Sequence, residues 1–117
     1  METITLHIGS VVVIDGREQD NLRPVKFKGE EVGSCEWFTD DRGTRGVTET
    51  LYKVETGQLV VHDEDWSRWQ GEPTVRKLVA VQPVDLDVGG RYERLGRACG
   101  MARPLTLDEA LSATEEG

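Results

Sequence analysis

The fold is decided by the stretch 47-VTETLYKVETGQLVVH-62. Its first half, residues 47–54, is dense in valine, threonine, leucine and tyrosine, which are residue types that favour β-strands. Glu55-Thr56-Gly57 matches a type I turn closed by a left-handed glycine, a common three-residue hairpin connection. Residues 58–62 then return to strand-forming residues. The stretch therefore predicts an antiparallel hairpin, and we expect the protein to be built around a sheet.

The N-terminal side of this hairpin holds four further strand-like stretches. Residues 3–8 alternate apolar and polar side chains without a fault, which is typical of a strand with one buried face. Residues 11–14 are apolar throughout, which predicts a buried strand. Residues 25–28 and 34–38 predict two more short strands. Residues 17–24 are polar, lack a period and end at a proline, so we expect a loop there.

The segment after the hairpin mixes helix and strand signals. Asp63-Glu64-Asp65 supplies N-cap side chains ahead of Trp66-Ser67-Arg68-Trp69, in which two tryptophans three residues apart predict one helical turn. Residues 74–82 form another β-like run. After a proline, the alternation of residues 84–88 predicts an edge strand or an extended arm.

Two short helices are expected toward the C-terminus. Tyr92, Leu95 and Cys99 recur at helical spacing, with arginines on the flank, which predicts a short amphipathic helix. Thr106-Leu107-Asp108-Glu109 has the form of a capping box, and a small apolar face follows it. The expected helical material is therefore gathered behind the strands.

Length and composition fit one domain. A chain of 117 residues with 37% hydrophobic residues can bury a core without support from disulfides or metals. We expect a single α+β domain over residues 1–117, an antiparallel β-sheet meander of about six or seven strands with short C-terminal helices. Residues 114–117 are expected to fray.

The charge balance argues against one class of partner unless a local basic patch exists. The sequence holds 14 lysine and arginine residues against 22 aspartate and glutamate residues, which gives a formal net charge of -8. Nucleic-acid binding draws most of its affinity from cationic side chains on phosphates, so direct binding to nucleic acid is not expected. Such a charge steers a protein toward a basic surface.

No targeting or membrane segment is evident. Residues 1–10 lack the positively charged segment with which a signal peptide begins. Residues 11–14 are too short to form its apolar centre. No apolar run approaches the length of a membrane span. We therefore expect a cytoplasmic protein that does not bind a membrane.

The sequence shows no convergent set of catalytic residues. Cys35 and Cys99 lack CxxC spacing and lie outside any nucleophile signature, so we expect reduced thiols inside the fold, with a bridge between the two left open. Gly89-Gly90-Arg91 lacks the residues of a phosphate-binding loop and is interpreted as a strand-to-helix turn. We predict no catalytic residue and no cofactor.

His62-Asp63-Glu64-Asp65 supports an alternative. Imidazole and carboxylate groups are ligands for divalent ions. A structural site would usually add a second histidine or a thiolate at a set spacing, and this stretch has neither. Capping carboxylates are the favoured interpretation, and no metal ligand is assigned. The alternative function is a small-molecule-binding or metal-assisted hydrolytic domain that uses His62, Asp63 and Asp65.

One cluster after the hairpin is the predicted binding site for a protein partner. It combines acidic residues with tryptophan and arginine, which are enriched where proteins bind one another. Its members are Asp63, Glu64, Asp65, Trp66, Arg68 and Trp69. The favoured function is therefore an acidic, non-catalytic module that binds a basic protein surface. One concrete form is a phage-borne or anti-CRISPR-like inhibitor, or an antitoxin-like regulator, that occupies the nucleic-acid-binding surface of its partner.

A set of short motifs between Val25 and Gly71 resembles a known family. The motifs are Phe27-Lys28-Gly29-Glu30, Trp37, Arg42-Gly43, Thr50-Leu51-Tyr52-Lys53 and Gly57-Gln58-Leu59-Val60-Val61-His62. Together they resemble the small bacterial EXLDI-type proteins. The resemblance implies no activity for this chain.

Overall fold

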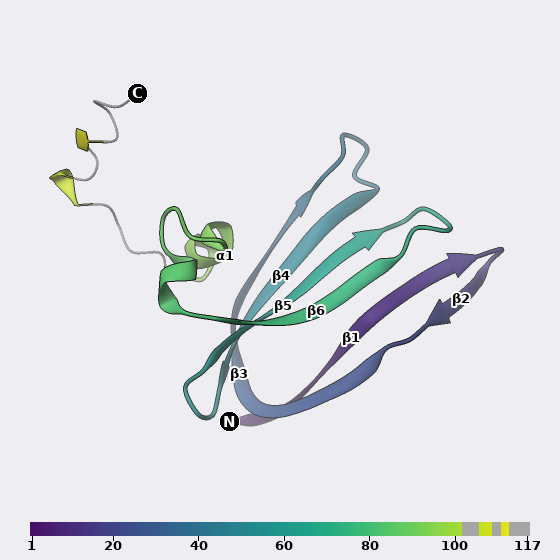
Figure 1. The fold of residues 1–117 in the computed structure, drawn as a ribbon, viewed down its shortest axis with the longest axis horizontal. Coiled ribbons are helices and arrows are strands. Elements are labelled where there is room, and N and C mark those ends of the chain that lie inside the picture. The colour runs from purple at the N-terminus through teal and green to yellow at the C-terminus, as the bar shows by residue number, and fades with distance from the viewer. Residues whose placement is uncertain (102–105, 109–110, 113–117) are drawn as a thin grey trace.

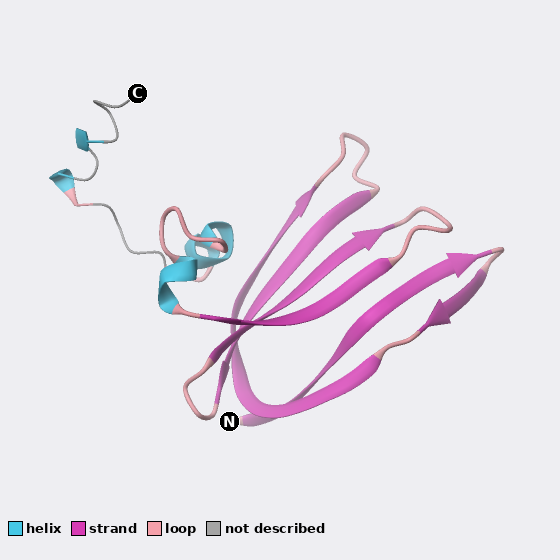
Figure 2. Ribbon diagram, viewed as in Figure 1, coloured by secondary structure: helices cyan, strands magenta, loops and turns pink. Residues whose placement is uncertain are grey.

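The computed structural model describes residues 1–101, 106–108 and 111–112, and most of them lie in strands (Figures 1 and 2). The described residues form one sheet of six strands, β1 (Glu2–Ile14), β2 (Arg17–Asp20), β3 (Arg23–Phe38), β4 (Arg45–Val54), β5 (Leu59–Ser67) and β6 (Thr74–Val81). Two short helical elements follow, the 3-10 helix η1 (Pro83–Leu86) and the helix α1 (Glu93–Ala98). The predicted antiparallel sheet is confirmed, and the helical part is smaller than expected.

The sheet closes on itself. Its strands follow the order β2-β1-β3-β4-β5-β6, and Gly9–Val11 of β1 also pairs with Thr74–Arg76 of β6. We name the side that carries η1 and α1 the helix face, and the other side the opposite face. On the opposite face, His62 Nε2 lies 2.9 Å from the carbonyl oxygen of His7. Strands β5 and β1 therefore meet across the closed sheet, although they are not neighbours in it.

The predicted hairpin is confirmed as β4 and β5. Its turn is closed by a hydrogen bond of 2.7 Å from the Gly57 N–H to the Val54 carbonyl, and Gly57 has a φ of 94°. Only glycine adopts this backbone conformation without strain, which is why the turn forms at this position. The resulting register places Leu51 opposite Val61. Both side chains are fully buried.

The core lies between the helix face and the two helical elements. Leu51, Val61 and Val81 of the sheet pack against three fully or nearly fully buried residues that follow the strands, Leu86, Tyr92 and Leu95. Of the three residues predicted to share one helical face, Leu95 lies in α1, Tyr92 is its N-cap and Cys99 its C-cap; Tyr92 and Leu95 belong to the core, and Cys99 packs against it. The helix α1 thus owes its position to apolar burial, because six residues are too few for a stable helix in isolation.

Strand β3 corrects the prediction of two short strands. Residues 25–28 and 34–38 belong to one strand of 16 residues, which also includes the polar residues between them. The register of β3 against β4 shifts between Glu31 and Gly33, as at a β-bulge. A bulge bends a strand without ending it, so the local break in the sequence pattern does not become a loop.

The predicted loop over residues 17–24 is wrong except at residues 21–22, which link β2 to β3. Residues 17–20 form β2, which pairs with residues 11–14 of β1. Asp15 and Gly16 have φ values of 53° and 75°, as a two-residue hairpin turn requires. This hairpin leaves its apolar arm partly in solvent, since Val13 and Ile14 are 38% and 43% exposed. The expectation of a buried strand at residues 11–14 is therefore corrected as well.

Two further predictions fail after the hairpin. Residues 63–67 continue β5 and pair with β4, so the predicted helical turn at residues 66–69 does not form. Residues 83–86 form η1 where an edge strand or extended arm was expected over residues 84–88. There, the Asp85 carboxylate accepts a hydrogen bond of 2.8 Å from the Gln82 N–H. Backbone pairing determines the structure of residues 63–67, and this local cap determines that of residues 83–86. In both places these contacts outweigh the side-chain patterns of the sequence.

The last expected helix falls only partly within the described residues. Leu107, Asp108, Leu111 and Ser112 are helical, whereas Glu109 and Ala110 lie outside the residues described, as do residues 114–117. None of the helices in the described part of the chain is long and apolar enough to cross a membrane.

Candidate functional site

Three aromatic residues, Phe38, Trp66 and Trp69, lie near the end of the sheet that carries the β3–β4 and β5–β6 loops. The two connecting loops lie at one end of the strands, and the β4–β5 turn lies at the other (Figure 1). We name these three residues, together with the two arginines that lie over the tryptophan rings, the aromatic tip. It comprises Phe38, Arg45, Trp66, Arg68 and Trp69. Phe38 is 57% exposed and Trp69 is 44% exposed.

Phe38 and Trp66 meet across a glycine. Both residues pair with Gly46 in the register of the sheet, one from each side. Their rings lie edge to face, with centroids 5.9 Å apart. The Arg68 guanidinium covers the Trp66 ring at 5.4 Å from its centroid. Aromatic and cation–π contacts of this kind hold the rings in one arrangement.

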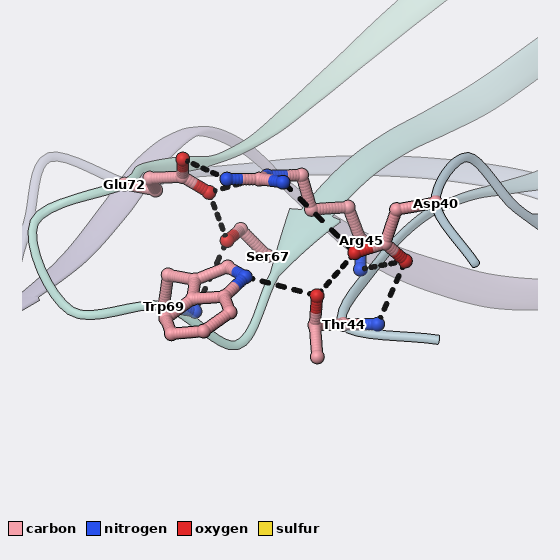
Figure 3. A network of polar contacts seen from close by, with 6 residues as sticks. All are labelled: Asp40, Thr44, Arg45, Ser67, Trp69 and Glu72. Atoms are coloured by element: carbon pink, nitrogen blue, oxygen red, sulfur yellow. Dashed lines mark hydrogen bonds and ion pairs between the residues drawn. The ribbon is translucent and has the colours of Figure 1, made fainter. Parts of the chain in front are cut away.

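A polar network holds Trp69 in place (Figure 3). Its indole Nε1–H donates to Thr44 Oγ1 at 2.9 Å, and the same hydroxyl donates to the Asp40 carboxylate. Asp40 also accepts hydrogen bonds from the Thr44 and Arg45 backbone N–H groups at 2.9 and 3.2 Å. The indole of one loop is therefore tied to the other loop.

Arg45 and Glu72 form the second half of this network (Figure 3). Arg45 donates two hydrogen bonds to the Glu72 carboxylate at 2.8 and 2.7 Å, and the Ser67 hydroxyl donates a third at 2.6 Å. The hydrogen bonds from Arg45 and then from Ser67 lower the pKa of Glu72 to about 2. Ser67 Oγ also accepts the Trp69 backbone N–H at 3.1 Å. An exposed ion pair adds little stability, so its effect is to orient the loops.

The six predicted partner-binding residues separate into two groups. Arg68 contacts Trp66, whereas Trp69 contacts Thr44 and Arg45 at the same end of the sheet. The acidic residues do not form one patch, because successive side chains of a strand point to opposite faces. Asp63 is buried on the helix face, and Asp65 lies exposed on that same face. On the opposite face, Glu64 pairs with Arg76 at 2.5 Å.

The alternation of side chains between the two faces of the sheet also places the residues of the alternative function on different faces. His62 lies on the opposite face, where its Nε2 contacts the His7 carbonyl, while Asp63 and Asp65 lie on the helix face. Among the described residues, no group of three or more histidine, cysteine, aspartate or glutamate side chains could hold a metal ion. The geometry therefore gives this alternative no assembled site.

The residues that the sequence reasoning missed lie beside Asp63. Glu49 is its direct cross-strand neighbour on the helix face, and the two carboxyl groups belong to residues that are only 6% and 8% exposed. Burial raises the pKa of both groups. The Asp63 charge raises the pKa of Glu49 further, and the Asp65 charge raises the pKa of Asp63 further. The signal was present in the sequence, because Glu49 shares its strand face with the core residue Leu51.

Cys35 completes this arrangement from β3. Its Sγ–H donates to Glu49 Oε1 at 3.7 Å. Burial, and then the Glu49 charge, raise the pKa of the thiol to about 11. The nucleophilic form of cysteine is the thiolate, so this group is unsuited to nucleophilic catalysis. Cys35 and Cys99 are both free and half-buried, as expected for reduced thiols inside the fold.

Glu49→Gln is expected to stabilise the protein more at high pH than at low pH. The ordinary pKa of Glu49 is 4.5, and its folded-state pKa is raised. Its contribution to stability is therefore fully present below pH 4.5 and is lost as the pH rises through the folded-state pKa. Glutamine keeps an acceptor for Cys35 without the charge, which should add about 1 kcal/mol above the folded-state pKa.

Urea unfolding at an acidic and at an alkaline pH checks this expectation, because a carboxyl group with a raised pKa gains its charge only as the pH rises. The matched control is Glu36→Gln, an exposed carboxylate on the other face of β3. An equal effect of Glu49→Gln at both pH values would contradict a buried charge at this position.

Comparisons of the chain with family models, curated proteins and solved structures give no match. The resemblance to EXLDI-type proteins stays a prediction.

Proposed function

We propose that the chain is a non-catalytic protein-binding module whose contact surface is the aromatic tip. The observation that carries this proposal is the state of Trp69, a residue that is 44% exposed and yet is tied by its indole N–H to Thr44 and by its backbone N–H to Ser67. A side chain in the core is held by packing, whereas this indole is held in solvent by polar contacts. Tryptophan and arginine dominate the binding energy of protein interfaces, and a contact that is already ordered loses less entropy on binding.

The proposed partner has a basic surface. The chain has a net charge of -8. Exposed carboxylates of Glu36, Asp41 and Asp65 lie in or beside the strand ends that form the tip. Opposite charges on two proteins raise the association rate and disfavour wrong partners. An inhibitor from a mobile element or an antitoxin-like regulator, which places carboxylates where a partner enzyme would hold phosphates, is one concrete form of this proposal.

Trp69→Ala tests the proposal. A pull-down from host lysate at low and high salt identifies the candidate partner, and calorimetry with the purified partner then gives the Kd. We expect the variant to bind about tenfold more weakly or worse, because exposed aromatic anchors carry a large share of interface energy. We also expect binding to weaken as salt rises, since exposed charges are screened beyond about 10 Å at 0.1 M.

Val84→Ala is the matched control, because Val84 is an exposed apolar residue of η1 outside the tip. It should leave the Kd unchanged. The proposal fails if the Trp69 variant binds as well as the unchanged chain, or if the affinity is insensitive to salt.

A further inference from the structure

A second site lies where β3 passes from β1 to β4, at the end of the sheet that carries the β4–β5 turn (Figure 1). There Gly29 pairs with Glu2 on one side and with Val54 on the other. A cavity of about 480 Å³ opens at this point, and we name it the Gly29 pocket. Sites for small molecules span about 300–1,000 Å³. Besides Gly29, six residues line the pocket, which are Met1, Glu2, Ile4, Glu30, Glu31 and Tyr52.

Tyr52 presents an unpaired hydroxyl group at this pocket. The residue is only 9% exposed, and its ring packs edge to face on Phe27 with the ring centroids 5.7 Å apart. In the part of the chain that the structure describes, the hydroxyl has no hydrogen-bond partner, and it is not one of the polar atoms that are closed off from solvent. Burial raises the pKa of Tyr52 and the Glu31 charge raises it further, so the phenol lies within electrostatic reach of that carboxylate. Buried polar side chains are nearly always paired, so this hydroxyl is held ready for a ligand.

Three carboxylates line the same pocket. Glu30 and Glu31 come from β3, Glu2 comes from β1, and all three residues are exposed. None of the three forms an ion pair with another described residue. They also do not converge on one point, because the described residues contain no group of three or more acidic, histidine or cysteine side chains that could hold a metal ion. The negative charge is therefore spread along the pocket.

We propose that the Gly29 pocket binds an aliphatic polyamine. Ammonium groups donate hydrogen bonds and accept none, so they suit the three carboxylates and the lone pairs of the Tyr52 hydroxyl. The methylene chain between them would lie against Ile4 and the Tyr52 ring. A metal ion is a single point of charge and cannot reach carboxylates that are spread apart. A polyamine carries its charges several bonds apart on an apolar chain, and the net charge of -8 attracts it to the protein.

Thermal unfolding of the full chain with millimolar probes at one ionic strength tests this site. The probes are spermidine, n-butylamine, which has a chain but only one charge, and magnesium chloride, whose cation has no chain. We expect spermidine to raise the Tm, because a ligand that binds only the folded state stabilises it. The two other probes should raise it less. No shift with spermidine, or an equal shift with either of the others, overturns the proposal.

Variants assign the binding to the pocket, with the Kd of spermidine measured by calorimetry. Glu31→Gln should weaken binding about tenfold, since it removes a charge-assisted hydrogen bond. Tyr52→Phe keeps the ring on Phe27 and removes only the hydroxyl, and it should weaken binding about fivefold.

Glu18→Gln is the matched control, because it removes one exposed carboxylate of β2 outside the pocket. It should leave the Kd unchanged. If it weakens binding as much as Glu31→Gln does, spermidine responds to the overall charge of the chain, and the proposal is overturned. Unchanged affinity in both pocket variants overturns it as well.

Discussion

Gly96→Ala is expected to destabilise the protein by about 3 kcal/mol, although alanine is the better helix former. Gly96 lies in the middle of α1, where the helix crosses η1. A Cβ atom at this position would lie 1.9 Å from the Leu86 carbonyl oxygen, which belongs to the backbone and cannot rotate away. The helix would have to move off η1, and the buried contacts of Leu86 and Leu95 would open. The free energy of unfolding in urea measures the loss.

The sign of this effect separates two causes. If helix propensity governed the position, the alanine variant would gain about 1 kcal/mol. If close packing governs it, the variant loses stability. Arg97→Ala is the control on the same helix, because it removes only an exposed ion pair with Glu93 and should change stability by less than about 0.5 kcal/mol. A stabilised Gly96→Ala variant would show that α1 does not depend on its contact with η1.

The features of this fold that could be predicted from the sequence are local ones. The β4–β5 hairpin follows from strand-forming residues on both sides of a turn that needs a glycine at position 57. The helix α1 follows from the spacing of Tyr92 and Leu95. In each case the residues that determine the structure lie within about two turns or one hairpin of each other, so the pattern is readable from one stretch of chain.

The failed predictions depend on partners far away in the sequence. Residues 63–67 carry good capping side chains, but their backbone groups pair with β4 on one side, and residues 63–65 pair with β6 on the other. Residues 17–20 carry no apolar pattern and become a strand only because β1 offers a free edge. Backbone pairing of this kind leaves little trace in the side-chain sequence, and it overrides weak local preferences.

The candidate sites also combine residues that local sequence could group with residues that only distant contacts bring there. Trp66, Arg68 and Trp69 were predicted as one binding group; Arg68 contacts Trp66, whereas Trp69 contacts Thr44 and Arg45 at the same end of the sheet. Phe38 joins them only through the register of three strands, which the sequence does not reveal. Asp63 was predicted to bind a partner, and it is instead buried on the helix face beside Glu49.

Gly46→Ala is expected to lower the stability by about 2 kcal/mol and to disrupt the aromatic tip as well. Gly46 is buried between Phe38 and Trp66. A Cβ atom there would lie 2.3 Å from Cζ2 of Trp66 and 2.7 Å from the Trp37 carbonyl oxygen. The indole must therefore leave its place, and its edge-to-face contact with Phe38 is lost. The variant should show a lower urea midpoint and a weaker Kd for the partner.

A double-mutant cycle identifies the Trp66 ring as the cause. Trp66→Leu removes the ring atoms that the new Cβ would meet, so the combined Gly46→Ala and Trp66→Leu variant should lose less stability than the sum of the two single losses. Residues in contact commonly couple by about 0.5–3 kcal/mol. Only part of the loss should be recovered, because the contact with the Trp37 carbonyl oxygen belongs to the backbone and persists. Strict additivity would place the strain elsewhere, and the aromatic tip would then not depend on a glycine at its centre.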